Sequence, residues 1–302
     1  MRMLLLGKNG QVGWELQRAL APLGELVACG SAEADLADLP ALEGLVRRVE
    51  PNLIVNAAAH TAVDRCESEP DRAMAINADA PGLLAREAAA LGALLLHFST
   101  DYVFDGSGSR PWVEDDATGP LNVYGHSKLA GEQAIRASGC HHLILRTSWV
   151  YAARGSNFAR TMLSLAAERD ALSVVDDQIG APTGAELIAD VTAHALRGVV
   201  QRPELGGTYH LTASGSTSWH GYARHVIKAA RVATPVKVAS NAIHAVPSSA
   251  FPAPARRPLN SRLDCRKLER AFDLTLPDWR IGVDRLLAEL LPVAISTKPP
   301  AR

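Results

Sequence analysis

The sequence is poor in cysteine and shows no excess of either charge. Its four cysteines, Cys29, Cys66, Cys140 and Cys265, are scattered over 302 residues without a Cys-x-x-Cys pair, which argues against a zinc finger or a disulfide scaffold and favours a reducing compartment. Lys and Arg number 31 against 32 Asp and Glu, so the chain lacks the bulk basicity of a nucleic-acid or anionic-membrane binder. We therefore expect neither nucleic acid nor membrane among its partners.

Long hydrophobic runs are missing as well. The apolar stretches at 93–96 and 286–291 are far shorter than the roughly 20 residues of a membrane-spanning helix. The apolar run before Gly7 is too short for a signal peptide, so we expect a cytoplasmic protein. Hydrophobic residues nevertheless make up 47% of the chain and charged residues 21%, a balance that excludes bulk disorder and supplies a core.

Strand and helix patterns alternate along the chain. Short apolar strands are expected at 2–6, 26–29, 53–57, 94–99 and 143–147, and helices at 14–23, 42–49, 73–91, 127–138, 157–169, 185–196, 219–231 and 281–291, with an extended proline-rich segment at 246–258 and a frayed tail at 298–302. Strands that are apolar throughout indicate a parallel sheet covered on both faces. We predict an α/β fold: a Rossmann-type doubly wound parallel sheet over 1–150 and a smaller, mainly substrate-binding domain over 151–302, some of whose segments return to the sheet.

A glycine loop separates the first strand from the first helix. Gly7, Gly10 and Gly13 are spaced G-x-x-G-x-x-G, a variant of the G-x-G-x-x-G fingerprint. Such glycines let backbone N–H groups approach a pyrophosphate at the helix N-terminus. A plain strand–helix turn is the alternative. The small residues 56–59 after the third strand leave room for a ligand at the same sheet edge, and the two features together predict a dinucleotide site.

The end of the second strand bears on cofactor choice. NAD-selective sites usually place Asp or Glu there to bind the ribose 2′-hydroxyl, whereas this chain has Gly30 and Ser31. Ser31 can donate a hydrogen bond to a 2′-phosphate, and Lys8 adds positive charge unless it simply faces solvent. Asp35, slightly further on, keeps dual use open. We predict that NADPH serves at least as well as NADH.

A candidate catalytic set follows the fourth strand. Tyr124 and Lys128 are four residues apart, hence on one helix face, where an ammonium would lower the phenol pKa from about 10. Thr100 ends the strand and can donate a hydrogen bond to a substrate oxygen. Tyr-x-x-x-Lys alone is common on helix surfaces. The order of glycine loop, Asn-Ala-Ala, Ser-Thr and Tyr-x-x-x-Lys, however, resembles the extended short-chain dehydrogenases/reductases.

The resemblance extends to a narrower family. The segments GKNGQVGWEL (7–16), VNAAAHTAVD (55–64), STDYVFDG (99–106), PLNVYG (120–125), RTSWVY (146–151), DQIGAPT (177–183) and RPLNS (257–261) are similar to those of dTDP-4-dehydrorhamnose reductases, over residues 1 to about 291. The resemblance implies reduction of dTDP-4-dehydro-6-deoxy-L-mannose to dTDP-L-rhamnose by a nicotinamide cofactor, the last step of that sugar nucleotide's synthesis.

The resemblance also implies residue roles. Thr100, Tyr124 and Lys128 match the catalytic trio, and Asp101, Tyr102 and Trp149 match positions that shape the sugar site, although Trp149 could also be a core aromatic. Arg257, with Arg256, suits a diphosphate or is an ordinary surface residue. The glycine loop, the second strand end and the resemblance together predict these cofactor contacts: Gly7, Asn9, Gly10, Gln11, Val12, Gly13, Gly30, Ser31, Asp35, Leu36, Ala59, His60, Thr61, Phe98, Tyr124 and Lys128.

Three glutamates raise the question of a metal. Glu15, Glu186 and Glu289 match positions that, in some members of the family, gather around Mg²⁺ at a homodimer interface, and oxygen ligands suit that ion. Three unrelated surface glutamates are the equal alternative.

Two rival functions remain open from the sequence. A non-catalytic regulatory subunit can share the fold, but such a subunit has no need of an intact Thr100, Tyr124 and Lys128. A sugar-nucleotide epimerase or dehydratase shares the cofactor site. A dehydratase of this type, however, carries an Asp-Glu pair after the threonine, where this chain has Asp101 and Tyr102, and an epimerase retains its cofactor tightly.

Overall fold

The computed structural model describes residues 1–233 and 236–291; the predicted frayed tail at 298–302 lies outside them. Its centre is a six-stranded parallel sheet in the order β10-β5-β4-β3-β1-β2. The strands are β1 (Arg2–Leu6), β2 (Glu25–Cys29), β3 (Leu53–Asn56), β4 (Leu94–Thr100), β5 (His142–Thr147) and β10 (Gly207–His210). The predicted α/β class and parallel sheet are confirmed. The sequence analysis missed β10, because its four residues, Gly-Thr-Tyr-His, include no aliphatic side chain and the strand begins at the second glycine of a pair.

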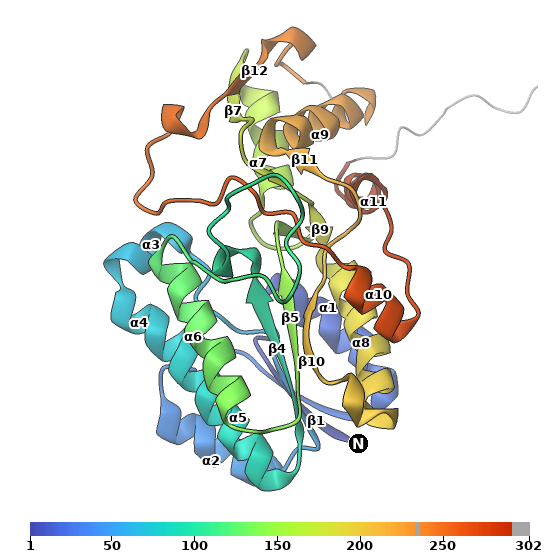
Figure 1. Cartoon of the computed structure of the whole chain (residues 1–302). Coiled ribbons are helices and arrows are strands. Elements are labelled where there is room, and N and C mark those ends of the chain that lie inside the picture. The colour runs from blue at the N-terminus through green and yellow to red at the C-terminus, as the bar shows by residue number, and fades with distance from the viewer. Residues whose placement is uncertain (234–235, 292–302) are drawn as a thin grey trace, which may run out of the picture.

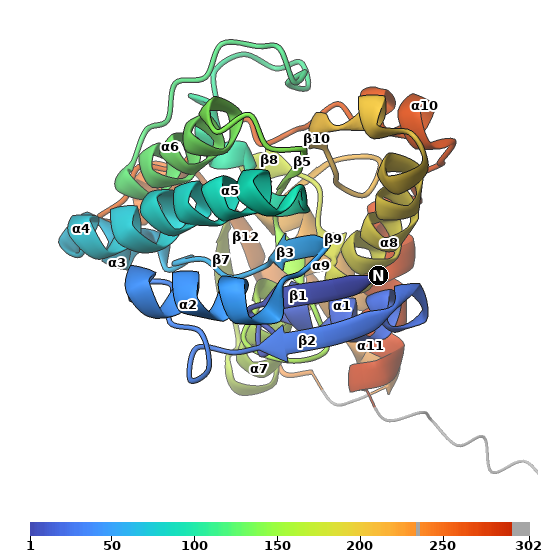
Figure 2. The ribbon, with the colours of Figure 1, turned by 90° about the horizontal axis from the view of Figure 1, so that it is seen from below.

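Helices cover both faces of the sheet (Figures 1 and 2). On one side lie α1 (Gln11–Leu20) and α8 (Ala185–Gln201), and on the other α2 (Leu39–Val49), α5 (Ala80–Leu91) and α6 (Val123–Ala137). Alternate strand residues feed the two cores: Met3 and Leu5 pack with the α1 and α8 side, Leu4 and Leu6 with the α2 and α5 side. This two-sided burial is why the strands are apolar throughout.

The long helix predicted over 73–91 is interrupted. The chain forms α3 (Val63–Ser68) and α4 (Pro70–Met74), then one π-helical segment, η2 (Ala75–Asp79), before α5. Gly92 ends α5 in the left-handed conformation with φ +66°, as expected of a glycine cap. π-Helical turns often mark functional sites, and this one lies beside α6, the helix that carries Tyr124 and Lys128.

Most of the remaining elements stand above the carboxyl ends of the strands (Figure 1), whereas α10 (Arg266–Phe272) packs beside the sheet against α8 and β10, and η4 (Pro203–Leu205) joins α8 to β10 at the opposite edge. The other elements are η3 (Asp101–Val103), β6 (Val150–Tyr151), α7 (Phe158–Glu168), β7 (Leu172–Val175), β8 (Ile179–Gly180), β9 (Thr183–Gly184), β11 (Thr217–Ser218), α9 (Trp219–Ala233), η5 (Ser240–Ala242), β12 (Ile243–Val246), η6 (Ser248–Ala250) and α11 (Trp279–Leu290), while η1 (Ala21–Leu23) extends α1. A separate apolar core joins α7, α9 and α11, whereas α8 and β10 return to the sheet. Among the described residues, no helix is long and apolar enough to cross a membrane.

Candidate active site

A cavity of about 650 Å³ opens at the carboxyl edge of the sheet. It brings together most of the predicted site residues from segments more than 100 positions apart: Gly7, Asn9, Gly10, Gln11, Val12, Gly30, Ser31, Asp35, Leu36, Ala59, Thr61, Phe98, Thr100, Asp101, Tyr102, Tyr124, Lys128 and Trp149. Parallel strands end at one edge, so residues after successive strands meet there.

The glycine loop is shaped by close backbone contacts. Gly7 adopts φ +88° and its N–H donates to the Cys29 carbonyl at 2.9 Å. Gly10 caps α1 without a side-chain hydrogen bond, and the first turn of α1 holds no acidic residue. The N–H groups and positive dipole end of α1 are therefore available to an anion, which fits the pyrophosphate of a dinucleotide. Gly13 is buried between α1 and the loop rather than exposed to the cavity.

A carboxylate that the sequence analysis overlooked lies near the second strand end. Glu33 accepts the Gly30 N–H at 2.8 Å and pairs with Lys8 Nζ at 2.6 Å. The ammonium, followed by this N–H, lowers the pKa of the glutamate. Lys8 is thus held beside the glycine loop rather than free in solvent, and it offsets the charge of Glu33. The turn that carries Glu33 back to Gly30 has no clear signal in the sequence.

Lys128 is buried beneath the cavity with 2% of its surface exposed. Its Nζ donates to the Phe98 carbonyl at 2.6 Å and lies 2.9 Å from His97 Nε2. Burial lowers the pKa of Lys128 to about 8, which the nearby Glu132 partly opposes. The ammonium is therefore poised to change charge near neutral pH.

The pKa of Tyr124 departs from the sequence expectation. We expected Lys128 to lower it, whereas burial of the hydroxyl raises it above its ordinary value, partly opposed by a hydrogen bond with Thr100. Desolvation of the phenolate is the largest cause of the shift, and Lys128 is not among the groups that lower this pKa. The hydroxyl therefore keeps its proton at neutral pH, as a proton donor must.

Asp101 directly follows Thr100 in the sequence and is 2% exposed. Thr100 Oγ1 donates to Asp101 Oδ1 at 3.1 Å, while Oδ2 is buried without a partner in the described chain. Burial raises the pKa of Asp101 to about 6. An unpartnered buried oxygen beside the cavity is suited to a hydroxyl of the substrate.

A second, larger cleft of about 1030 Å³ adjoins the first, and Tyr102 and Trp219 line both. Arg256 and Arg257 line the larger cleft, and Arg257 is held by Asp64 at 2.7 Å. Trp149 has the left-handed φ of +48° and stacks on Trp219 at a centroid distance of 3.6 Å. Strained backbone of this kind persists where the surroundings over-determine it, and here it holds an indole at the 650 Å³ cavity.

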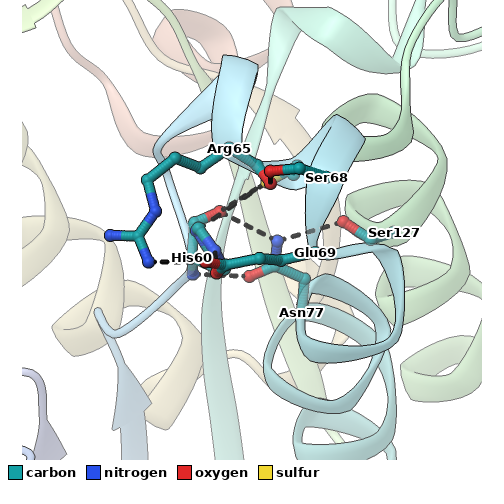
Figure 3. Close-up of polar contacts among 7 residues, drawn as sticks. His60, Arg65, Ser68, Glu69, Asn77 and Ser127 are labelled. Carbon is teal, nitrogen blue, oxygen red and sulfur yellow. Dashed lines mark hydrogen bonds and ion pairs between the residues drawn. The ribbon is translucent and has the colours of Figure 1, made fainter.

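His60 points elsewhere (Figure 3). Its ring lies 3.1 Å from Glu69 Oε2, and its backbone N–H and carbonyl bond the side chain of Asn77 in the π-helical turn. The side chain is absent from the residues that line the described cavity, and the predicted cofactor contact of His60 stays a prediction. Asn77 also donates to Ser127 Oγ at 3.0 Å, which ties the loop after β3 to α6.

The sequence analysis also overlooked several residues of the lining. Arg72 and Ile76 come from α4 and the π-helical turn, and Thr147 and Ser148 from the end of β5, beside Trp149. Thr147 and Ser148 could have been predicted, because they end and follow a parallel strand at the edge where ligands bind. Trp219 carries no local signal, because α9 reaches the site only through tertiary packing.

The three candidate metal ligands are paired with arginines. Glu15 lies 3.6 Å from Arg18, and Glu186 and Glu289 lie 3.1 and 3.8 Å from Arg285. Within the described parts of the chain, no three His, Cys, Asp or Glu side chains are grouped to hold a metal ion. A single chain thus does not provide the predicted Mg²⁺ site.

The doubly wound sheet, its glycine loop and the cavity at its carboxyl edge are those of the short-chain dehydrogenase/reductase class of oxidoreductases. Comparison with known proteins narrows the class. Residues 1–291 match the family model described as the RmlD substrate binding domain. The chain is 56% identical over 294 residues to the dTDP-4-dehydrorhamnose reductase of Escherichia coli K12, covering 96% of this chain and 98% of that one, and 55% identical, with the same coverage, to that of Shigella flexneri.

Solved structures agree. A dTDP-4-dehydrorhamnose reductase from Clostridium acetobutylicum has a TM-score of 0.87 at 34% identity, covering 96% of this chain and 99% of that one. The Bacillus anthracis enzyme, solved in complex with NADP, has a TM-score of 0.86 at 34% identity, covering 95% and 99%. The chain belongs to the dTDP-4-dehydrorhamnose reductase family, and its activity is the reductase activity of that family.

Proposed function

We propose that the chain reduces the 4-keto group of dTDP-4-dehydrorhamnose with NADPH as the hydride donor and Tyr124 as the proton donor. The observation that carries this proposal is the position of Tyr124: its buried, protonated hydroxyl lies with Thr100 in the lining of the 650 Å³ cavity, and its ring lies 5.5 Å from that of Tyr102, which also lines the larger cleft. When bound, the cofactor supplies the hydride. Every other step falls to groups of the chain.

The cavity suits NADPH. The uncapped N-terminus of α1 receives the pyrophosphate, and the second strand ends in Gly30 and Ser31, both of which line the cavity. Lys8 compensates the only carboxylate that bonds this strand end in the described chain, Glu33. A relative of this fold binds NADP. These features support a site that tolerates a 2′-phosphate.

The larger cleft suits the sugar nucleotide. Arg257 and Arg256 supply positive charge for the diphosphate, and Arg suits bidentate phosphate contacts. Tyr102 lines both cavities, and Trp149 lines the 650 Å³ cavity, where it stacks on Trp219, which also lines both. The unpartnered Asp101 oxygen is available to a sugar hydroxyl.

Proton transfer follows from the charges around Tyr124. Its hydroxyl donates to the C4 oxygen as that oxygen gains negative charge, and Thr100 shares the polarisation. The tyrosinate left behind is a buried anion, which burial disfavours. Lys128, one helical turn away, supplies the compensating positive charge.

The test is Tyr124→Phe, with the decay of NADPH absorbance measured with and without the 4-keto sugar nucleotide. We expect turnover to fall by roughly 10²–10⁴-fold and NADPH binding to persist. Tyr222→Phe is the matched control, because Tyr222 is a buried tyrosine in the separate α7–α9–α11 core whose hydroxyl has no partner in the described chain. Near-normal turnover of Tyr124→Phe would refute the assignment, and decay without the sugar substrate would refute the reaction.

A further inference from the structure

The ammonium group of Lys128 contacts the buried imidazole of His97, which has no part in the reaction proposed above. His97 Nε2 lies 2.9 Å from Lys128 Nζ, and His97 Nδ1 lies 3.1 Å from Asn56 Nδ2. Asn56 Oδ1 in turn accepts the N–H of Ala58 at 3.2 Å. The three side chains come from β3, β4 and α6, and each is at most 2% exposed. A donor that faces another donor in this series of contacts therefore has no water molecule to bond with instead.

Which group donates and which accepts in these side-chain hydrogen bonds depends on the charge of Lys128. With Asn56 Oδ1 facing Ala58, the amide Nδ2 donates to His97 Nδ1, so the ring carries its hydrogen on Nε2. An Nε2–H can be donated to Lys128 only if the lysine is a neutral amine.

A charged Lys128 needs the opposite arrangement. An ammonium has three donors and no lone pair, so His97 Nε2 must accept and the ring hydrogen must sit on Nδ1. That hydrogen then requires Asn56 Oδ1 in place of Nδ2, which means a rotated amide. The Ala58 N–H then gives up its weak 3.2 Å bond. Each charge state of Lys128 therefore matches one tautomer of His97 and one orientation of Asn56.

We propose that His97 is a positioning residue that couples the charge of Lys128 to its own tautomer and to the orientation of the Asn56 amide at the base of the cofactor cavity. The proton balance is simple. Ammonium with the Nδ1–H ring becomes neutral amine with the Nε2–H ring, and one proton leaves to solvent. Asn56 and Ala58 both line the cavity, so the charge state reaches the surface that receives the cofactor. The inference rests on the proposed role of Lys128.

The other groups around Lys128 leave His97 as its principal side-chain partner. Tyr124 and Glu132 lie on the same helix, and Asp101 lines the same cavity. Glu132 is held by Arg146 of β5 at 2.7 and 2.8 Å. Burial and the Lys128 charge keep the pKa of His97 well below its usual range, so His97 stays neutral and responds by changing tautomer rather than charge.

The first test compares His97→Leu with His97→Gln in the pH dependence of kcat/KM, which reports ionisations of the free enzyme. Leucine removes the acceptor from the ammonium, so we expect the alkaline limb to move to lower pH by about one pH unit. Activity then falls about fivefold at pH 8 and little at pH 6. Gln places an oxygen near the position of Nε2 and should keep the limb near that of the unaltered enzyme.

His210→Gln is the matched control. His210 is also fully buried, at the end of β10, which is separated from β4 by β5, and its Nδ1 lies 3.1 Å from the Trp112 carbonyl oxygen. We expect its alkaline limb to match that of the unaltered enzyme. A limb in His97→Leu that coincides with the unaltered enzyme would overturn the proposal, as would a uniform loss at all pH values that Gln does not rescue.

The second test needs no altered histidine and no activity. In ¹⁵N-histidine NMR spectra of the full chain, with the His97 signals assigned by their loss in His97→Gln, we expect an Nδ1–H tautomer near pH 6.5 to give way to Nε2–H near pH 9.5. In Lys128→Met the ring should stay Nε2–H throughout. The same tautomer at both pH values in the unaltered protein overturns the coupling. Normal turnover by Lys128→Met would instead refute the proposed role of Lys128, which separates the two failures.

Discussion

Alanine substitutions in the glycine loop separate its three glycines by the space around each. A Cβ on Gly13 would lie 2.0 Å from the Gly7 carbonyl oxygen, whereas a Cβ on Gly10 comes no closer than 3.4 Å to it. Overpacking against fixed backbone costs about 3 kcal/mol, and alanine in a helix recovers up to about 1 kcal/mol. We expect Gly13→Ala to lower the free energy of unfolding by about 2 kcal/mol and Gly10→Ala to change it by less than about 1 kcal/mol.

Gly7→Ala should be at least as damaging as Gly13→Ala. Its φ of +88° costs an L-residue about 1–2 kcal/mol, and its Cβ would lie 2.8 Å from backbone atoms of Ala57 and Ala58. Urea unfolding midpoints measure stability, and NADPH fluorescence measures binding. Gly10 lines the cavity, so Gly10→Ala should lose affinity for NADPH while its urea midpoint falls less than that of Gly13→Ala. Equal midpoints for Gly10→Ala and Gly13→Ala would refute the reasoning.

Three further predictions concern charged groups: those at the second strand end, the ammonium of Lys128, and the three glutamates paired with arginines. NADPH should be used at least as well as NADH, and a tenfold preference in kcat/KM for NADH, about 1.4 kcal/mol, would contradict this. Ser31→Asp should shift selectivity toward NADH more cleanly than Gly30→Asp, whose Cβ would lie 2.5 Å from Asn9 Nδ2. Burial lowers the pKa of Lys128 from 10.5 to about 8, so between these values the unfolded chain binds more protons and stability rises with pH. Lys128→Met should remove that part of the rise in urea titrations from pH 8 to 10.5, and an unchanged slope would count against the buried ammonium. Arg18 and Arg285 already pair with Glu15, Glu186 and Glu289, so we expect EDTA to leave the sedimentation coefficient unchanged. A fall in that coefficient would instead support a dimer bridged by a metal ion.

Local patterns in the sequence were sufficient for five of the six strands of the sheet, all but β10, and for the position of the site. The apolar strands and the glycine loop depend on period and on steric freedom, which neighbouring residues express. Since parallel strands end at one edge, the order of motifs alone placed Thr100, Tyr124 and Lys128 beside the glycine loop. The helix at 73–91 was less predictable, because its Ala-rich pattern does not reveal a π-helical turn held by the side chain of Asn77.

Tertiary structure alone decided the electrostatics and the far wall of the site. The pKa of Lys128 depends on its burial, and that of Tyr124 on the desolvation of its hydroxyl. Glu33 reaches Gly30 through a turn, and Trp219 reaches Trp149 across 70 positions of sequence. Periodicity and motif spacing describe which residues are neighbours along one element, whereas a pKa or a stacked pair depends on the groups that other elements bring within a few ångströms and on the water they exclude.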